Sequence, residues 1–182
     1  HQSEHPAEYY GLSMSVGALP TTLDRLMRAY GALANDGVLR DLAWYRGAAP
    51  EKGARVMSVD AARLVTLFLS DPSARLPSFP RMGTTEYPFP VAVKTGTSQG
   101  YRDAWTVADS RKYMVGVWLG RADAGPMRDV TGSASAAALA QAIMLDLHGK
   151  DVDAAKPAFP VPPNYRLRAI CADEDAPRSC GD

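Results

Sequence analysis

The sequence is short of the residue types that mark several common kinds of site. Among its 182 residues are 2 cysteines and 3 histidines, whose spacing suggests neither a catalytic triad nor a metal site. The 20 basic residues equal the 20 acidic ones, so no excess charge favours nucleic acid or a membrane surface as a partner. No apolar run reaches the roughly 18 residues that a membrane span requires. The length suits one domain, with room for a small appendage.

The cysteines are candidates for a disulfide, and the histidines are not expected to form a site. Cys171 and Cys180 are candidates for one disulfide, which would close a loop of about ten residues and contribute roughly 2 to 3 kcal/mol. Such a bridge requires an oxidising compartment, and two free surface thiols are the alternative. His1, His5 and His148 are expected on the surface. We expect no metal site and no cofactor.

The start of the chain, HQSEHPAEYYG, lacks an initiator methionine and the basic-then-apolar order of a signal peptide. We therefore expect the chain to be a piece of a longer protein.

Two amphipathic helices are expected in the first half of the chain. Thr21 is a plausible N-cap for a helix with apolar residues at three- and four-residue steps, which Asn35-Asp36-Gly37 would end through a left-handed glycine. Val38 to Arg40 would then start a short extended piece. Ser58 caps a second helix that stops before Asp71-Pro72.

A three-stranded antiparallel sheet is expected next, after a loop from Pro72 to Pro90. Its strands would be formed by residues 91–93, 103–108 and 112–119, and Asp109-Ser110-Arg111 has hairpin turn chemistry. An Ala-rich helix from Ser133 to His148 follows, and Gly149 would end it. Four prolines between residues 152 and 163 then indicate a semi-rigid linker, so we place a domain boundary near residue 150.

The stretch VAVKTGTSQG places Lys94 beside two threonines and a glycine at the end of the first expected strand. An ammonium and two hydroxyls are donors suited to an anionic or carbonyl-bearing ligand, and Gly96 lets the ligand approach the backbone. A phosphate-binding loop is excluded, since that motif needs glycine where Pro88 and Val93 stand. A solvated lysine before a glycine turn is the other interpretation of these residues alone.

The wider context resembles a known family. KTGTSQGYRDAWTVAD followed by YMVGVWLG is similar to the strand hairpin of penicillin-binding transpeptidase domains. YYGLSMSVGALPTTLDRLMRAYGALANDG resembles the helical segment that precedes this strand in the bifunctional peptidoglycan synthases of the family. The resemblance implies an α+β fragment of the serine β-lactamase and penicillin-binding transpeptidase fold, with antiparallel strands packed against helices. Residues 1–150 would be the C-terminal part of the transpeptidase domain, and residues 151–182 a proline-rich linker and the start of a C-terminal extension.

Site roles follow from the resemblance position by position. Lys94 and Thr97 are implied to be catalytic, the lysine by electrostatic support and Thr97 through a backbone N–H that donates to an oxyanion. Lys94, Thr95, Gly96 and Thr97 would bind the carboxylate of a peptidoglycan stem peptide or a β-lactam antibiotic. On the next strand, sheet packing is expected for Trp105.

Three residues between and beside these strands also have expected roles. Asp103 is expected to brace Arg102 or a loop. Tyr101 and Arg102 are candidates to border the ligand groove.

The nucleophile of that family is a serine followed three residues later by lysine, and this sequence contains no such pair. A serine without an activating base is a weak nucleophile, so a free-standing serine hydrolase is poorly supported. We expect this chain to be part of a peptidoglycan-cross-linking DD-transpeptidase and to be inactive alone. Its partner would be the missing N-terminal part of the same domain. That protein would act in the periplasm, with any membrane anchor upstream. The alternative is a non-catalytic module that binds wall peptides or a partner protein.

Overall fold

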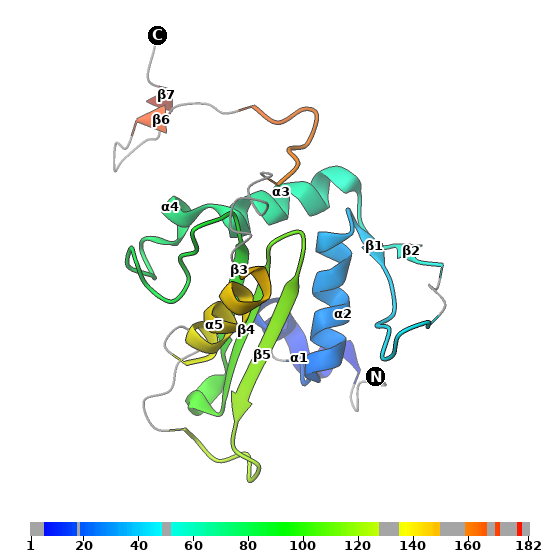
Figure 1. The fold of residues 1–182 in the computed structure, drawn as a ribbon. Helices are drawn as coiled ribbons and strands as arrows, with labels where there is room; N and C mark the ends of the chain where they lie inside the picture. Colours follow the sequence, from blue (N-terminus) through cyan, green and yellow to red (C-terminus); the bar gives the residue numbers. More distant parts are fainter. Residues whose placement is uncertain are drawn as a thin grey trace.

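The computed structural model of the chain describes residues 6–17, 19–48, 52–127, 135–149, 159–166, 170–171 and 178–179. Its centre is an antiparallel sheet in the order β3-β4-β5, made of Ala92–Thr97, Asp103–Asp109 and Met114–Gly120. Figure 1 shows this sheet between α5 on one side and α2 on the other, with α3 crossing near one end of the strands. The three expected strands and their antiparallel pairing are confirmed, although β3 extends through the Lys-Thr-Gly motif.

Helix α2 (Leu23–Ala34) and helix α3 (Val59–Ser70) occupy the positions that their patterns predict. The Ser58 hydroxyl accepts a hydrogen bond from the Ala61 N–H at 3.1 Å and so caps α3, as expected. The N-cap of α2 is Thr22 rather than Thr21, and no side-chain cap bond is made there. The Thr22 hydroxyl instead interacts with Asp24, and this hydrogen bond is the main reason that the pKa of Asp24 lies below its ordinary value.

The end of α2 fits its sequence. Asp36 and Gly37 adopt φ values of 52° and 87°, and the Gly37 N–H donates to the Ala32 carbonyl at 2.7 Å, which closes the helix through two left-handed residues. Asp36 then joins the two helices, since its carboxylate accepts two hydrogen bonds from Arg63 at 2.8 and 2.9 Å. The bidentate pair holds the end of α2 beside the first half of α3.

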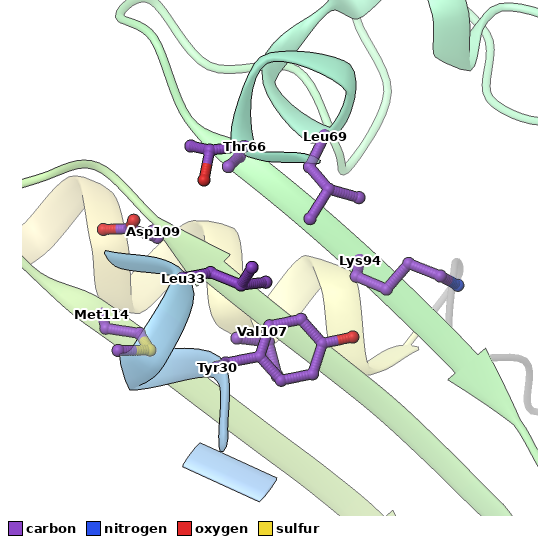
Figure 2. Close-up of a pocket in the computed structure, with 9 residues that line it drawn as sticks. Tyr30, Leu33, Thr66, Leu69, Lys94, Val107, Asp109 and Met114 are labelled. Atoms are coloured by element: carbon purple, nitrogen blue, oxygen red, sulfur yellow. The ribbon is translucent and has the colours of Figure 1, made fainter. Parts of the chain in front are cut away.

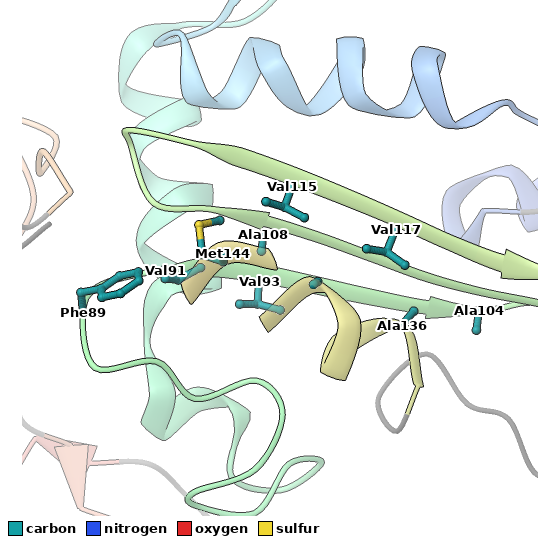
Figure 3. Close-up of a cluster of buried hydrophobic side chains, with 10 residues drawn as sticks. Phe89, Val91, Val93, Ala104, Ala108, Val115, Val117, Ala136 and Met144 are labelled. Atoms are coloured by element: carbon teal, nitrogen blue, oxygen red, sulfur yellow. The ribbon is translucent and has the colours of Figure 1, made fainter. Parts of the chain in front are cut away.

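Side chains of the sheet alternate between two covered faces. One face packs against α5 (Ala137–His148) and forms the main apolar core (Figure 3). That core consists of Phe89, Val91, Val93, Ala104, Ala108, Val115, Val117, Ala136, Ala140 and Met144. The opposite face packs against α2 and α3. The chain therefore builds a three-layer arrangement of helix, sheet and helices, which confirms the expected α+β class.

The remaining elements are short. The short helices are α1 (Ala7–Tyr10), η1 (Gly11–Val16), α4 (Pro72–Arg75) and η2 (Gln99–Tyr101). Two short two-stranded antiparallel sheets are formed by β1 (Val38–Leu39) with β2 (Ala54–Arg55) and by β6 (Ile170–Cys171) with β7 (Arg178–Ser179). Helix α4 lies in the stretch that the sequence predicts as loop, where Asp71 caps it and Pro72 opens it. Within the described residues, no helix is both long and apolar enough to cross a membrane.

The surface position predicted for His148 is wrong. Its side chain is only 3 % exposed, and its Nε2 lies 2.8 Å from the Ser110 hydroxyl in the turn between β4 and β5. The imidazole packs on the rings of Phe89 and Tyr113, with centroids 4.3 and 5.1 Å away. The last turn of α5 packs on the turn between β4 and β5, so His148 is buried although it lies at a helix end.

Several predictions fall outside the described residues. His1 and His5, the expected helix start at Ser133, most of the proline-rich linker and Cys180 lie there. The disulfide between Cys171 and Cys180 and the domain boundary near residue 150 therefore stay predictions.

Candidate functional site

The Lys-Thr-Gly motif lies on β3, which forms one edge of the described sheet. The strand directs its side chains alternately, so Lys94 and Gly96 lie on the face covered by α2 and α3, whereas Thr95 and Thr97 share the face of Val93. The four predicted site residues are therefore together on one strand but divided between its two faces. All four residues lie along the same edge strand of the described sheet.

The register of β3 and β4 determines which backbone N–H and C=O groups of β3 point outward at this edge. The Ser98 N–H donates to the Asp103 carbonyl at 3.0 Å, and Thr97 is paired with Ala104 in the same register. Hydrogen-bonded and non-hydrogen-bonded pairs alternate along an antiparallel ladder, so the N–H and C=O groups of Thr95 and Thr97 point away from β4. The Nζ of Lys94 donates to the Thr95 carbonyl at 2.6 Å, which agrees with that direction. The edge thus presents a row of main-chain donors and acceptors beside an ammonium.

Lys94 lies at one end of a small cleft between the sheet, α2 and α3 (Figure 2). The hydroxyl end of Tyr30 is turned toward the Lys94 side of this cleft, and burial raises the pKa of that phenol. Asp109 lies at the other end, and burial likewise raises the pKa of its carboxyl. Lys94 itself is exposed and makes no ion pair with any residue that the structure describes. Its charge is therefore open to an anionic ligand.

The turn that follows β3 is tightly held. Gly100 and Tyr101 have φ values of 71° and 56°, and a left-handed tyrosine is uncommon. Ser98 fixes the turn with its carbonyl, which accepts from the Tyr101 N–H at 3.1 Å, and with its hydroxyl, which accepts from the Asp103 N–H at 2.9 Å. The Met127 N–H donates to the Tyr101 carbonyl at 2.8 Å and ties a later loop to the turn. The groove-bordering role of Tyr101 and Arg102 stays a prediction.

The next strands carry two tryptophans that contact each other. Trp105 packs against Trp118 with ring centroids 6.0 Å apart, so the sheet-packing role predicted for Trp105 is confirmed. Asp103 was expected to brace Arg102 or a loop, but its carboxylate accepts a hydrogen bond from the Trp118 indole at 2.9 Å. Its backbone does hold the Ser98 turn. Alternating strand patterns mark both tryptophans, but only the register brings Trp118 beside Asp103.

One serine and histidine pair does form in the fold, and sequence spacing gave no sign of it. Ser110 and His148 are 38 positions apart, and their side chains are joined at 2.8 Å. Both residues are buried, with exposed fractions of 4 % and 3 %, and the Ser110 hydroxyl also bonds to Tyr113 in the hairpin turn. This pair has a structural role, because no substrate reaches it. The described residues contain no group of three metal-ligating side chains.

Comparison with known proteins tests the family resemblance seen in the sequence. No family model matches the sequence. Penicillin-binding protein 1C of Escherichia coli (strain K12) is 35% identical over 130 residues, which are 70% of this chain and 16% of that protein.

Solved structures give the same picture at the level of fold. The PonA1 protein of Mycobacterium tuberculosis in complex with penicillin V aligns with a TM-score of 0.61 and 18% identity, over 81% of this chain and 43% of that one. The apo TP domain of Burkholderia pseudomallei penicillin-binding protein 3 aligns with a TM-score of 0.52 and 25% identity, over 82% and 46%.

The chain spans less than half of the length of these solved chains and a smaller part of the E. coli protein. The matched sequence and the matched fold agree, and both include most of this chain. The chain belongs to the penicillin-binding proteins and forms part of their transpeptidase fold.

Proposed function

We propose that this chain supplies the ligand-binding strand of a peptidoglycan-cross-linking DD-transpeptidase, as the C-terminal part of that domain. The observation that carries the proposal is the edge of β3, where the exposed Lys94 ammonium lies beside the outward N–H groups of Thr95 and Thr97. A stem peptide ending in D-Ala-D-Ala, or a β-lactam that mimics it, has a carboxylate for the lysine and threonines. It also has a carbonyl oxygen for a backbone donor.

The division of the motif between two faces suggests a division of labour. Thr95, Gly96 and Thr97 line the edge and bind the ligand together with Lys94, and the Thr97 N–H is one oxyanion donor. Lys94 points to the other face and stabilises negative charge near the reacting group. These assignments make Lys94 and Thr97 the catalytic residues of this chain.

The reaction itself requires a serine that these 182 residues do not supply in a Ser-x-x-Lys pair. Its hydroxyl oxygen would attack the penultimate D-Ala carbonyl, form an ester and release the terminal D-Ala as the amine leaving group. An amine of a neighbouring stem peptide would then attack the ester and free the serine. The serine comes from the N-terminal part of the same domain, supplied upstream or by a separate chain.

The setting of this chemistry is part of the proposal. Peptidoglycan lies outside the cytoplasm, so the protein would act in the periplasm or on the outer face of the inner membrane, with an anchor upstream. That compartment is oxidising, which favours a disulfide between Cys171 and Cys180. Residues 1–150 would belong to the transpeptidase domain, and residues 151–182 would link it to a C-terminal extension.

Lys94→Ala tests the proposal in the longer protein that contains this chain and the serine. Loss of one charged donor at a developing charge costs on the order of 1.5 to 3 kcal/mol, so the rate of acylation by a fluorescent penicillin should fall about ten- to a hundredfold. Lys52→Ala is the matched control, because Lys52 is an exposed lysine in the loop before β2. Wild-type acylation by Lys94→Ala would contradict the role given to this residue, and a non-catalytic binding module would then be favoured.

A further inference from the structure

Two neighbouring aromatic side chains protrude from the loop between β1 and β2. Its residues 40–48, which we call the aromatic loop, contain Trp44 at 76% exposure and Tyr45 at 73% exposure. Figure 1 shows β1 and β2 on the outer side of α2, away from the sheet that carries Lys94. Two adjacent rings with this exposure form an apolar surface that the packing of the chain does not use.

The aromatic loop is held at its base and at its tip. At the base, β1 and β2 are paired, and the Arg55 guanidinium donates to the Asp36 carbonyl at 2.9 Å. At the tip, the Ala48 N–H donates to the Tyr45 carbonyl at 3.3 Å, and Gly47 has a φ of 85°, which glycine permits in a turn. A surface whose backbone is fixed loses less conformational entropy when a ligand covers it.

The area of the two rings indicates the size of the ligand. An aromatic side chain can bury about 150 to 250 Å², so at these exposures Trp44 and Tyr45 together present roughly 200 to 400 Å². One partner in a stable protein interface contributes about 800 Å². The pair of rings is therefore too small for a stable protein partner and suits a narrow ligand.

The surface around the rings is open. No residue of the aromatic loop lines the cleft beside Lys94. A Cβ atom added to Gly47 would meet nothing within 4 Å apart from its chain neighbours. Small molecules are usually bound in enclosed, concave sites. An open surface fits a polymer that lies across it.

The charges near the rings favour an anionic ligand. From residue 40 to residue 55 the sequence has four basic residues and two acidic ones, and one of the acids, Asp41, is paired with Arg28 of α2. Arg46 directly follows Tyr45, is exposed, and makes no ion pair with any residue that the structure describes. A fitting polymer therefore combines apolar faces with carboxylates.

We propose that the aromatic loop binds a glycan strand of peptidoglycan, as a second contact with the wall polymer outside the β3 edge. The choice of ligand rests on the proposed function, which brings the wall polymer to this protein. A sugar ring has C–H groups on its faces, and these pack on the electron-rich face of an aromatic ring, so Trp44 and Tyr45 stack on sugars. Arg46 binds a carboxylate of a stem peptide on the same strand.

Co-sedimentation with purified peptidoglycan sacculi measures this contact. The longer protein that contains this chain and the serine is kept in excess penicillin, so that the β3 edge is occupied. Trp44→Ser combined with Tyr45→Ser should raise the Kd at least about tenfold, because both stacking contacts are lost. Trp44→Phe with Tyr45→Phe is the matched control, since it keeps both rings, and its Kd should stay within about threefold of wild type. An unchanged Kd for the serine pair overturns the proposal, and so does an equal loss for the phenylalanine pair.

Arg46→Gln gives a second readout that depends on charge. Its Kd for sacculi should be about threefold higher than that of wild type at about 0.05 M salt, and the difference should shrink at about 0.5 M salt because salt screens exposed charges. An equal difference at both salt concentrations, or no difference at either, would contradict the carboxylate contact.

Other occupants are tested with the same variants. Binding to anionic lipid vesicles that the serine pair weakens as strongly as sacculus binding would mean a lipid surface. Self-association in sedimentation velocity that the serine pair abolishes would mean a second copy. Either result overturns the proposal.

The two proposals fail separately, because sacculus binding does not depend on acylation. Wild-type acylation by Lys94→Ala would contradict the proposed function alone. An unchanged sacculus Kd for the Trp44 and Tyr45 serine pair would contradict the role of the aromatic loop alone.

Discussion

At the scale of single residues, the strand from Lys94 to Thr97 divides its side chains between two faces of the sheet, and the proposed function gives each face its own task. A β-strand sends neighbouring side chains to opposite faces, so the lysine and the threonines cannot point the same way. The strand lies at an edge of the described sheet, so a ligand bound there, as proposed, could contact the main chain and both sets of side chains. The identities of these residues could be predicted from the sequence. Their distribution over two faces could not, because the sequence predicts a strand over residues 91–93, whereas β3 continues to Thr97.

Asp109 provides a test of the electrostatics of the cleft. Burial raises the pKa of its carboxyl above the ordinary value of 3.8, with the Arg111 backbone N–H acting in the opposite direction. Between pH 3.8 and the raised pKa, the folded chain binds more protons than the unfolded chain, so this group lowers stability as pH rises through that window. Asp109→Asn should therefore raise the Tm at pH 7 and remove this decline, measured by thermal unfolding between about pH 3 and pH 7.

The control for Asp109 is a carboxylate with the opposite shift. The hydrogen bonds from Arg63 lower the pKa of Asp36, so its contribution is present above pH 3.8 and is lost as pH falls through the lowered value. Asp36→Asn should lower the Tm slightly at pH 7, by about 2 °C or less, because the pair is partly exposed. A lower Tm for Asp109→Asn at pH 7 would contradict the cost assigned to burial of its charge.

At the scale of elements, the end of α2 depends on one glycine. Gly37 has a φ of 87°, and an added Cβ atom would collide with the Met57 carbonyl oxygen, which is part of the backbone. Gly37→Ala should therefore lower the free energy of unfolding by roughly 1 to 3 kcal/mol.

Gly31→Ala is the matched control for Gly37→Ala. Gly31 lies inside α2, and its added methyl group would find only ordinary contact with Met114 at 3.8 Å. The control should stabilise the chain by about 0.5 to 1 kcal/mol through helix propensity. Urea unfolding of both variants measures the difference, and equal stability of the two would contradict this geometry.

The elements show what sequence patterns can and cannot indicate. The periodicity of α2 and α3, the Ser58 cap and the strand hairpin from Lys94 to Gly120 depend on near neighbours, and they are where the patterns place them. The prediction that His148 lies on the surface is wrong because the packing of α5 on the sheet surrounds it with Phe89, Ser110 and Tyr113. The Met127 contact with the Tyr101 turn and the bond between Asp103 and Trp118 escaped prediction for the same reason.

At the scale of the whole molecule, the chain forms part of the transpeptidase fold. It contains the helices and the strands around the Lys-Thr-Gly edge, yet its length is less than half of the solved relatives that share the fold. The absence of a Ser-x-x-Lys pair is visible in the sequence, whereas the exposure of Trp118 on the same face as Lys94 required the sheet register. Both point to a site that is completed by further chain.

The most direct test of that claim is to map where a fluorescent penicillin attaches. The 182-residue chain and the longer protein are labelled side by side, separated on a denaturing gel and digested for mass spectrometry. We expect no label on the 182-residue chain, and in the longer protein a label on a serine outside these residues. A label on any serine within the 182-residue chain would mean that the nucleophile lies here and that the site is not partial.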